Sequence, residues 1–256
     1  MSVDTIEATS PPADHRIPYG IDPFQFCDLR VPDKQGPHPV AVMVHGGFWR
    51  SIYGLKYLGH ICAALTSVGI ATWNIEYRRL GNPGGGWPGT FDDVSNAADY
   101  VGAVARDFNL DLNRTIAIGH SAGGHLALWL ATRKKPLRGV VSLAGVVDLK
   151  RAWELRLSNT VVADLLGGSP DEVAERYQFA SPIEHLPLGI PQKLFHGTAD
   201  PSVPYEISER YVHAAQLTSD DAELITLENA GHFELVDHRT KEFALVRDAA
   251  LSLIAE

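Results

Sequence analysis

The chain has 256 residues, of which 45% are hydrophobic and 21% charged, and its formal net charge at pH 7 is -9. This length and composition are typical of a globular protein with one large domain or two small ones. The acidic balance argues against nucleic acid or an anionic membrane as the partner, because both select clusters of Lys and Arg.

The cysteine content and the N-terminal residues indicate the cellular compartment in which the protein is expected. Cys27 and Cys62 are the only cysteines, and two reduced thiols in a reducing compartment are favoured over one disulfide. The first residues lack the apolar stretch of a signal peptide, and no apolar run is long enough for a membrane-spanning helix. We therefore expect a cytoplasmic protein with no membrane partner.

Polar residues and prolines over residues 1–20 predict a flexible N-terminal arm. Beyond the arm, short apolar runs alternate with segments of helical periodicity. The predicted strands are 22–32, 39–45, 70–77, 115–121, 139–149, 192–200 and 222–231. The predicted helices are 55–69, 91–108, 122–132, 204–217 and a last helix from about residue 239.

The strands of this pattern are continuous apolar runs, without strict alternation of apolar and polar residues. Such runs, separated by helices, indicate an α/β fold with a mostly parallel central sheet and helices on both faces. Residues 150–190 are less regular and predict a small insertion over the sheet. Residues 21–256 are therefore predicted to form a single domain.

A candidate nucleophile lies between a predicted strand and a predicted helix. Residues 119–123 read GHSAG and match G-x-S-x-G, in which glycines flank a sharp turn that projects the serine hydroxyl above the sheet. Ser121 would also lie at a helix N-terminus, which favours a nearby negative charge. The alternative is that these glycines only allow close packing of a helix on the sheet.

A nucleophilic serine needs a histidine as base and a carboxylate that orients the histidine. In hydrolases of this topology the acid and then the histidine follow the serine, each on a loop after a late strand. Asp200 follows the predicted strand KLF, and His232 follows LITLENAG. Asp200 and His232 are therefore the predicted acid and base.

Other titratable residues lie near the same segments and receive structural interpretations. His196 directly ends a strand and is expected to be buried and hydrogen-bonded. Asp237 and His238 are expected to be solvated or to cap the last helix. His120 is the variable residue of the pentapeptide and could contact substrate or a neighbouring loop, whereas His125 is expected to pack in the helix.

The stabilisation of a tetrahedral oxyanion requires two or three preorganised N–H donors. One should come from Ala122, which follows the nucleophile, and the others from a loop after an earlier strand. The sequence HGGFW at 45–49 lies where that loop belongs. We predict that Gly47 and Phe48 supply the donors, and that His45 anchors the turn and is not the catalytic base.

These motifs resemble the α/β-hydrolase fold, in particular the hormone-sensitive-lipase-like carboxylesterases and the kynurenine formamidase (arylformamidase) group. The resemblance covers about residues 20–256 and includes HGGFW, GHSAGGHLA and the loops of Asp200 and His232. HGGFW is the most telling part, because H-G-G-x-W, with Trp49, is similar to the formamidase form of the motif. The resemblance implies acyl hydrolysis without a cofactor or metal.

We therefore predict a serine hydrolase that cleaves a small-molecule ester or amide, with N-formylkynurenine as the first candidate substrate. A carboxylesterase for short acyl esters is the alternative within enzymes, and a non-catalytic binding module is the alternative outside them. Trp49, Trp87 and His120 are candidates for the substrate pocket. The sequence does not indicate an oligomeric state.

Overall fold

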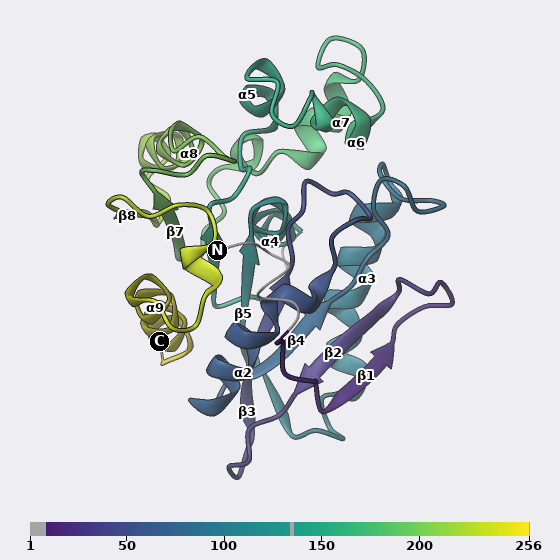
Figure 1. Cartoon of the computed structure of the whole chain (residues 1–256), viewed down its shortest axis with the longest axis vertical. Helices are drawn as coiled ribbons and strands as arrows, with labels where there is room; N and C mark the ends of the chain where they lie inside the picture. The colour runs from purple at the N-terminus through teal and green to yellow at the C-terminus, as the bar shows by residue number, and fades with distance from the viewer. Residues whose placement is uncertain (1–8, 134–135, 256) are drawn as a thin grey trace.

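The computed structural model describes residues 9–133 and 136–255, and within them eight strands form one sheet. The strand order is β1-β2-β4-β3-β5-β6-β7-β8 (Figure 1). The strands are β1 (His15–Pro18), β2 (Phe26–Arg30), β3 (His38–Val44), β4 (Ala71–Ile75), β5 (Leu110–His120), β6 (Gly139–Leu143), β7 (Gln192–Gly197) and β8 (Ala222–Leu227). From β4 to β8 neighbouring strands are parallel, whereas β2 is antiparallel to both β1 and β4. The predicted mostly parallel sheet is confirmed.

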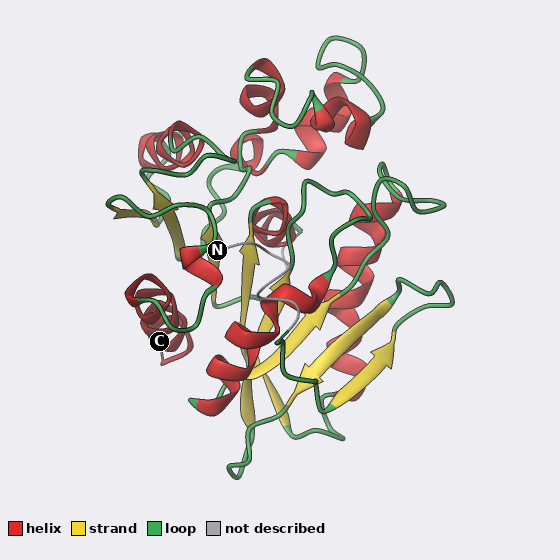
Figure 2. Ribbon diagram, viewed as in Figure 1, coloured by secondary structure: helices red, strands yellow, loops and turns green. Residues whose placement is uncertain are grey.

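Helices cover both faces of this sheet (Figure 2). Those of the main layers are α2 (Gly59–Ser67), which follows the short helix η1 (Leu55–Leu58), α3 (Gly89–Val104), α4 (Ala122–Thr132), α8 (Glu206–Leu217) and α9 (Lys241–Ala255), which follows η3 (Glu234–Val236). α2 and α9 pack in one hydrophobic cluster, and α3, α4 and α8 pack in the other. The sheet therefore separates two cores.

The central strands explain why the sequence shows continuous apolar runs. All seven residues of β3 are buried. Because successive side chains of a strand point to opposite faces, Val40, Val42 and Val44 join the core of α3, α4 and α8. Ala41 and Met43 join the core of α2 and α9. A strand covered on both faces is therefore apolar at most positions, which is why it lacks strict alternation in the sequence.

Part of the segment predicted as a flexible arm, residues 1–20, forms a strand. His15–Pro18 form strand β1, which pairs with β2 through the register His15 to Leu29. The pairing is reinforced by Arg16, whose guanidinium donates two hydrogen bonds to the carboxylate of Asp28, at 2.8 and 2.9 Å. An edge strand of four mostly exposed residues has no apolar pattern, so the sequence did not reveal it. Residues 1–8 of the predicted arm lie outside the described residues.

A group of short helices connects β6 to β7, where the sequence predicted an insertion at 150–190. The helices are α5 (Leu149–Glu154), α6 (Val161–Leu166), α7 (Ala174–Ala180) and η2 (Pro182–His185). Figure 1 shows α5, α6 and α7 grouped at the top of the view, beyond the carboxyl end of β5. We call residues 149–185 the cap segment. Its position is where a substrate-binding region of a parallel sheet is expected.

Two further features bear on the predictions made from the sequence. Cys27 and Cys62 are both buried and neither forms a disulfide. Among the helices of the described ranges, none combines the length and the apolar character needed to cross a bilayer.

Candidate active site

Ser121 occupies the turn between β5 and α4. β5 ends at His120 and α4 begins at Ala122, so a single residue must reverse the direction of the chain. Ser121 consequently has φ 57° and ψ -122°, a strained conformation that costs roughly 1–3 kcal/mol. Its N–H donates to Leu143 O at 2.8 Å, and its carbonyl accepts the N–H of His125 at 3.2 Å. These contacts with β6 and α4 hold the strained residue in place.

The glycines of the pentapeptide are required by close approach of backbone atoms. A Cβ at Gly119 would lie 2.0 Å from Gly123 O, and a Cβ at Gly123 would lie 2.0 Å from Val44 O. Neither position can accept a side chain without movement of β3 or α4. The alternative interpretation of these glycines as packing residues is therefore correct in part, since close packing is what brings Ser121 to the end of β3.

His232 and Asp200 form a hydrogen-bonded pair at the carboxyl ends of β7 and β8. His232 Nδ1 lies 2.6 Å from Asp200 Oδ2. A carboxylate oxygen is an acceptor, so Nδ1 carries the proton and Nε2 of a neutral ring is left as a base. The ring centroid of His232 lies 4.5 Å from that of His120, the residue before Ser121. The pair predicted from the sequence is thus brought together beside the end of β5.

The side chain of Asp200 is fully buried, and its two oxygens have different partners. Oδ1 accepts the backbone N–H groups of Ser202 and Val203 at 2.7 and 2.9 Å. Oδ2 faces His232, and His196 Nε2 lies 3.5 Å away. Burial raises the pKa of Asp200, but the hydrogen bonds from His196, His232 and Val203 outweigh burial and lower it. Asp200 therefore stays ionised at neutral pH.

His196 is buried beside Asp200, in agreement with its interpretation as a structural residue. Its Nδ1 lies 2.7 Å from Ser208 Oγ, and its Nε2 donates to Val203 O at 2.9 Å. His196 thus connects α8 to the loop that carries Asp200. Asp237 receives two hydrogen bonds from the Arg239 guanidinium just before α9.

The loop after β3 has an unusual backbone conformation. Gly47, Phe48 and Trp49 have φ values of 107°, 50° and 55°. Gly46 lies against Ser121, because a Cβ there would be 2.8 Å from Ser121 Cβ. Within the described residues, no acceptor pairs with the N–H groups of Gly47, Phe48 or Ala122. Unpaired N–H groups beside a serine are the arrangement that stabilises an oxyanion.

His45 faces away from this serine. Its Nδ1 lies 2.8 Å from Gly46 O, and its Nε2 lies 3.0 Å from Glu76 Oε1. Glu76 also accepts from Leu55 N at 3.1 Å and from Arg79 at 3.0 Å. Burial raises the pKa of Glu76, but His45, Arg79 and the Leu55 N–H outweigh burial and lower it. This buried ionic cluster anchors both ends of the loop, and the sequence had indicated only the His45 part of it.

Trp49, a candidate for the substrate pocket, has no exposed surface in the structure. It is fully buried, and its indole N–H donates to His125 Nδ1 at 3.2 Å. His125 Nε2 in turn donates to Ala180 O at 2.8 Å. Burial lowers the pKa of His125 to about 4, which keeps the ring neutral. Trp49 therefore connects the loop after β3, through α4, to the cap segment.

His120 is also buried, with 1% of its surface exposed, and is not available to a substrate. Both of its ring nitrogens are hydrogen-bonded, one to Tyr57 and one to His232 O. Trp87 is partly exposed and packs edge-on against Phe179 of the cap segment, with ring centroids 5.0 Å apart. Of the three candidate pocket residues, only Trp87 has exposed surface to offer. Tyr57 was not identified from the sequence, because no local motif marks it.

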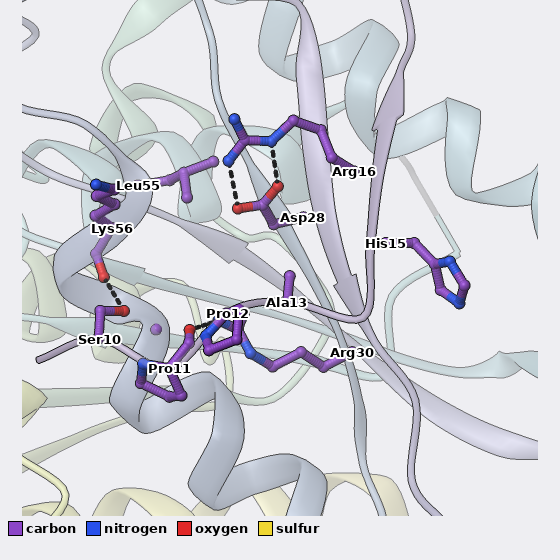
Figure 3. Close-up of a pocket in the computed structure, with 11 residues that line it drawn as sticks. Ser10, Pro11, Pro12, Ala13, His15, Arg16, Asp28, Arg30, Leu55 and Lys56 are labelled. Atoms are coloured by element: carbon purple, nitrogen blue, oxygen red, sulfur yellow. Dashed lines mark hydrogen bonds and ion pairs between the residues drawn. The ribbon is translucent and has the colours of Figure 1, made fainter.

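A separate pocket of about 420 Å³ lies between the N-terminal segment, β1, β2 and α2 (Figure 3). Arg30 lines it and donates to Pro11 O at 2.7 Å, while Arg16 and Asp28 pair with each other. Arg30 Nε and Nη1 have no hydrogen-bond partner among the residues that the structure describes, and both are closed off from solvent. A ligand in the pocket would not meet these nitrogens, so they provide no binding site there.

Neither the composition of the site nor its geometry points to a metal ion. Across residues 9–133 and 136–255, no three His, Cys, Asp or Glu side chains converge as metal ligands. The groups gathered there are a strained serine, a histidine paired with a buried carboxylate, and backbone N–H groups that have no acceptor among the described residues. Together they are suited to nucleophilic attack on a carbonyl group.

The sequence is similar to a known protein family and to several curated proteins. A protein-family model described as BD-FAE matches residues 27–214. A probable isoprenylcysteine alpha-carbonyl methylesterase of Arabidopsis thaliana is 26% identical over 88% of this chain and 52% of its own length. A probable isoprenylcysteine alpha-carbonyl methylesterase of Oryza sativa subsp. japonica is 27% identical over 85% of this chain and 57% of its own length. The chain thus spans about half the length of these curated relatives.

Solved structures agree on the fold. A truncated carbohydrate esterase from gut microbiota superposes with a TM-score of 0.82 at 22% identity, covering 96% of this chain and 99% of the other. An esterase B from Lactobacillus rhamnosis superposes with a TM-score of 0.84 at 18% identity, covering 99% and 91%. The chain has the α/β-hydrolase fold, as the sequence predicted.

Proposed function

The chain belongs to the BD-FAE family, and from that premise we propose that it is a serine hydrolase that cleaves esters of small acyl groups. The observation that carries the proposal is the strained Ser121 beside the hydrogen-bonded pair of His232 and Asp200. A strained backbone at a serine destabilises the fold, and such strain is concentrated at active sites. A buried carboxylate that orients a histidine is the arrangement that activates a serine hydroxyl.

In this proposal Ser121 Oγ attacks the ester carbonyl while His232 Nε2 removes the hydroxyl proton. Asp200 keeps the proton of the neutral imidazole on Nδ1 and stabilises the cation that forms. The N–H groups of Gly47, Phe48 and Ala122 bind the oxyanion of the tetrahedral intermediate. His232 then donates its proton to the leaving alcohol and activates the water that hydrolyses the acyl-enzyme.

Esters are better supported as substrates than formamides. The relatives described above are named as esterases, and none of these is named as a formamidase. The formamidase prediction depended on Trp49 in the HGGFW motif, and that tryptophan is buried against His125. Because Trp49 packs in the interior, the HGGFW motif is explained by the structure of the loop. Trp49 therefore does not indicate a particular substrate. Formamide hydrolysis therefore stands only as the competing outcome of a substrate comparison.

The deciding experiment compares kcat/KM for p-nitrophenyl acetate, p-nitrophenyl butyrate and N-formylkynurenine, with Ser121→Ala as control. We expect ester turnover that depends on Ser121 and formamide turnover close to the uncatalysed rate. A higher kcat/KM for N-formylkynurenine than for either ester would reverse the assignment of substrate. Full ester turnover by Ser121→Ala would refute the mechanism.

A further inference from the structure

The strongest unassigned feature is a chain of hydrogen bonds around His120. His120 Nδ1 lies 2.9 Å from Tyr57 Oη, and His120 Nε2 lies 2.9 Å from His232 O. Tyr57 Oη also accepts the backbone N–H of Gly46 at 2.6 Å. Four residues from four separate segments are thus linked by three hydrogen bonds.

The chemistry of the end groups determines the direction of every bond. The carbonyl of His232 can only accept, so the proton of a neutral His120 ring is on Nε2. Nδ1 is then an acceptor, and the hydroxyl of Tyr57 donates to it. Burial and the neighbouring His232 lower the pKa of His120 to about 3, so the neutral ring persists at all working pH values.

The bonds join two loops that the sheet itself does not connect. Gly46 follows β3 and His232 follows β8, and strands β5, β6 and β7 lie between β3 and β8 in the sheet. His120, at the end of β5, reaches both loops from the position next to Ser121. A residue that served only the core would not need to bond the backbone of one reactive loop and, through a tyrosine, that of another.

We propose that Tyr57 and His120 are positioning residues that hold the oxyanion loop and the base loop in register around Ser121. This inference rests on the proposed function. Tyr57 fixes Gly46, and with it the N–H groups of Gly47 and Phe48. His120 fixes the main chain of His232, whose side chain is separately fixed by Asp200. Misplacement of such groups by about 1 Å can reduce turnover by about a hundredfold without contact with substrate.

Variants of the two side chains, Tyr57 and His120, separate the three hydrogen bonds. Tyr57→Phe removes the hydroxyl and with it both the Gly46 and the His120 contact. His120→Gln retains an amide N–H at the position of Nε2, whereas His120→Asn retains an acceptor at the position of Nδ1. Tyr211→Phe is the matched control, because Tyr211 is fully buried in α8 and its hydroxyl donates to Gln192 Oε1 at 2.6 Å.

The measurements are kcat and KM for p-nitrophenyl acetate, affinity for a trifluoromethyl ketone and melting temperature. Tyr57→Phe, His120→Gln and His120→Asn should lower kcat by about 10- to 100-fold and leave KM within about twofold. Tyr57→Phe and His120→Gln should also weaken ketone binding, because the adduct contains the oxyanion. Tyr211→Phe should lower the melting temperature and leave kcat unchanged.

The double variant Tyr57→Phe/His120→Gln provides a further check, since both changes break the same link and should not multiply in their effect on kcat. Wild-type kcat in Tyr57→Phe and in both His120 variants would overturn the inference. If at the same time Ser121→Ala were inactive, the proposed function would stand and only the positioning role would fail. Full activity of Ser121→Ala would instead refute the proposed function itself.

Discussion

Replacement of Asp200 by asparagine tests how the carboxylate controls His232. The two backbone N–H groups of Ser202 and Val203 both point at Oδ1, while Oδ2 faces His232 Nδ1. In Asp200→Asn, the amide oxygen must remain with the two N–H donors, because an NH₂ group there would leave them unpaired. The NH₂ group would then face His232 and donate to Nδ1.

This forced orientation reverses the tautomer of His232. With Nδ1 as acceptor, the ring proton moves to Nε2, and no base remains for the Ser121 hydroxyl. A reversed tautomer in an otherwise intact triad lowers kcat by about 10⁴-fold, equivalent to about 5 kcal/mol at ~1.4 kcal/mol per factor of ten. The N–H contacts of Oδ1 are kept, so we expect the fold to persist.

The assay is hydrolysis of p-nitrophenyl acetate by wild type and Asp200→Asn at pH 7.5, with melting temperature and circular dichroism as controls for folding. A loss of at least a thousandfold in kcat in a folded variant is the expected result. A folded variant with kcat within tenfold of wild type would show that Asp200 does not orient the base, and would refute the reasoning.

Three further changes probe the loop and the pH response. Gly47→Ala places a Cβ 2.4 Å from the Cβ of Tyr53, on a residue whose φ is 107°. We expect kcat to fall by about 10- to 100-fold. Unchanged kinetics would contradict the proposed role of this loop in binding the oxyanion. Trp49→Phe leaves His125 Nδ1 unpaired and should cost about 1–3 kcal/mol in unfolding free energy, with KM within about twofold, whereas a large rise in KM alone would mean that Trp49 contacts substrate. The Arg239 guanidinium, opposed by burial, lowers the pKa of Asp237 to about 2. Because this folded-state pKa is below that of the unfolded chain, the stabilisation is complete above about pH 5 and is lost as the pH falls from about 4 to 2. The difference in melting temperature between wild type and Asp237→Asn should therefore be smaller at pH 3 than at pH 6, and an equal difference at both would exclude the ion pair.

The sequence predicted those parts of the molecule that depend on local pattern. Helix α4 was expected over residues 122–132 and occupies that range, because an apolar run follows directly on the turn at Ser121. The central strands were recognisable because burial on both faces favours apolar residues at most of their positions. β1 was missed because its four residues are mostly exposed and their pairing depends on Arg16 and Asp28.

The contacts that support the site could not be read from local pattern. Tyr57 and His120 are 63 residues apart, His120 and His232 are 112 apart, and Trp49 and His125 are 76 apart. Each bond exists only once the strands have assembled, and a histidine in a motif gives no sign of which loop it will meet. The same limit explains why Trp49 was a candidate for the substrate pocket, although its partner is His125 of α4.

The central claim, that Ser121 is the nucleophile of an ester hydrolase, is tested most directly by covalent labelling with diethyl p-nitrophenyl phosphate. Esterase activity and the mass of the intact protein are followed together, and the labelled residue is located by peptide mass spectrometry. We predict one diethyl phosphoryl group per chain, on Ser121, with esterase activity lost in proportion to labelling, and no label on Ser121→Ala. Label at another residue in proportion to inactivation, or complete labelling of Ser121 with activity retained, would contradict the account.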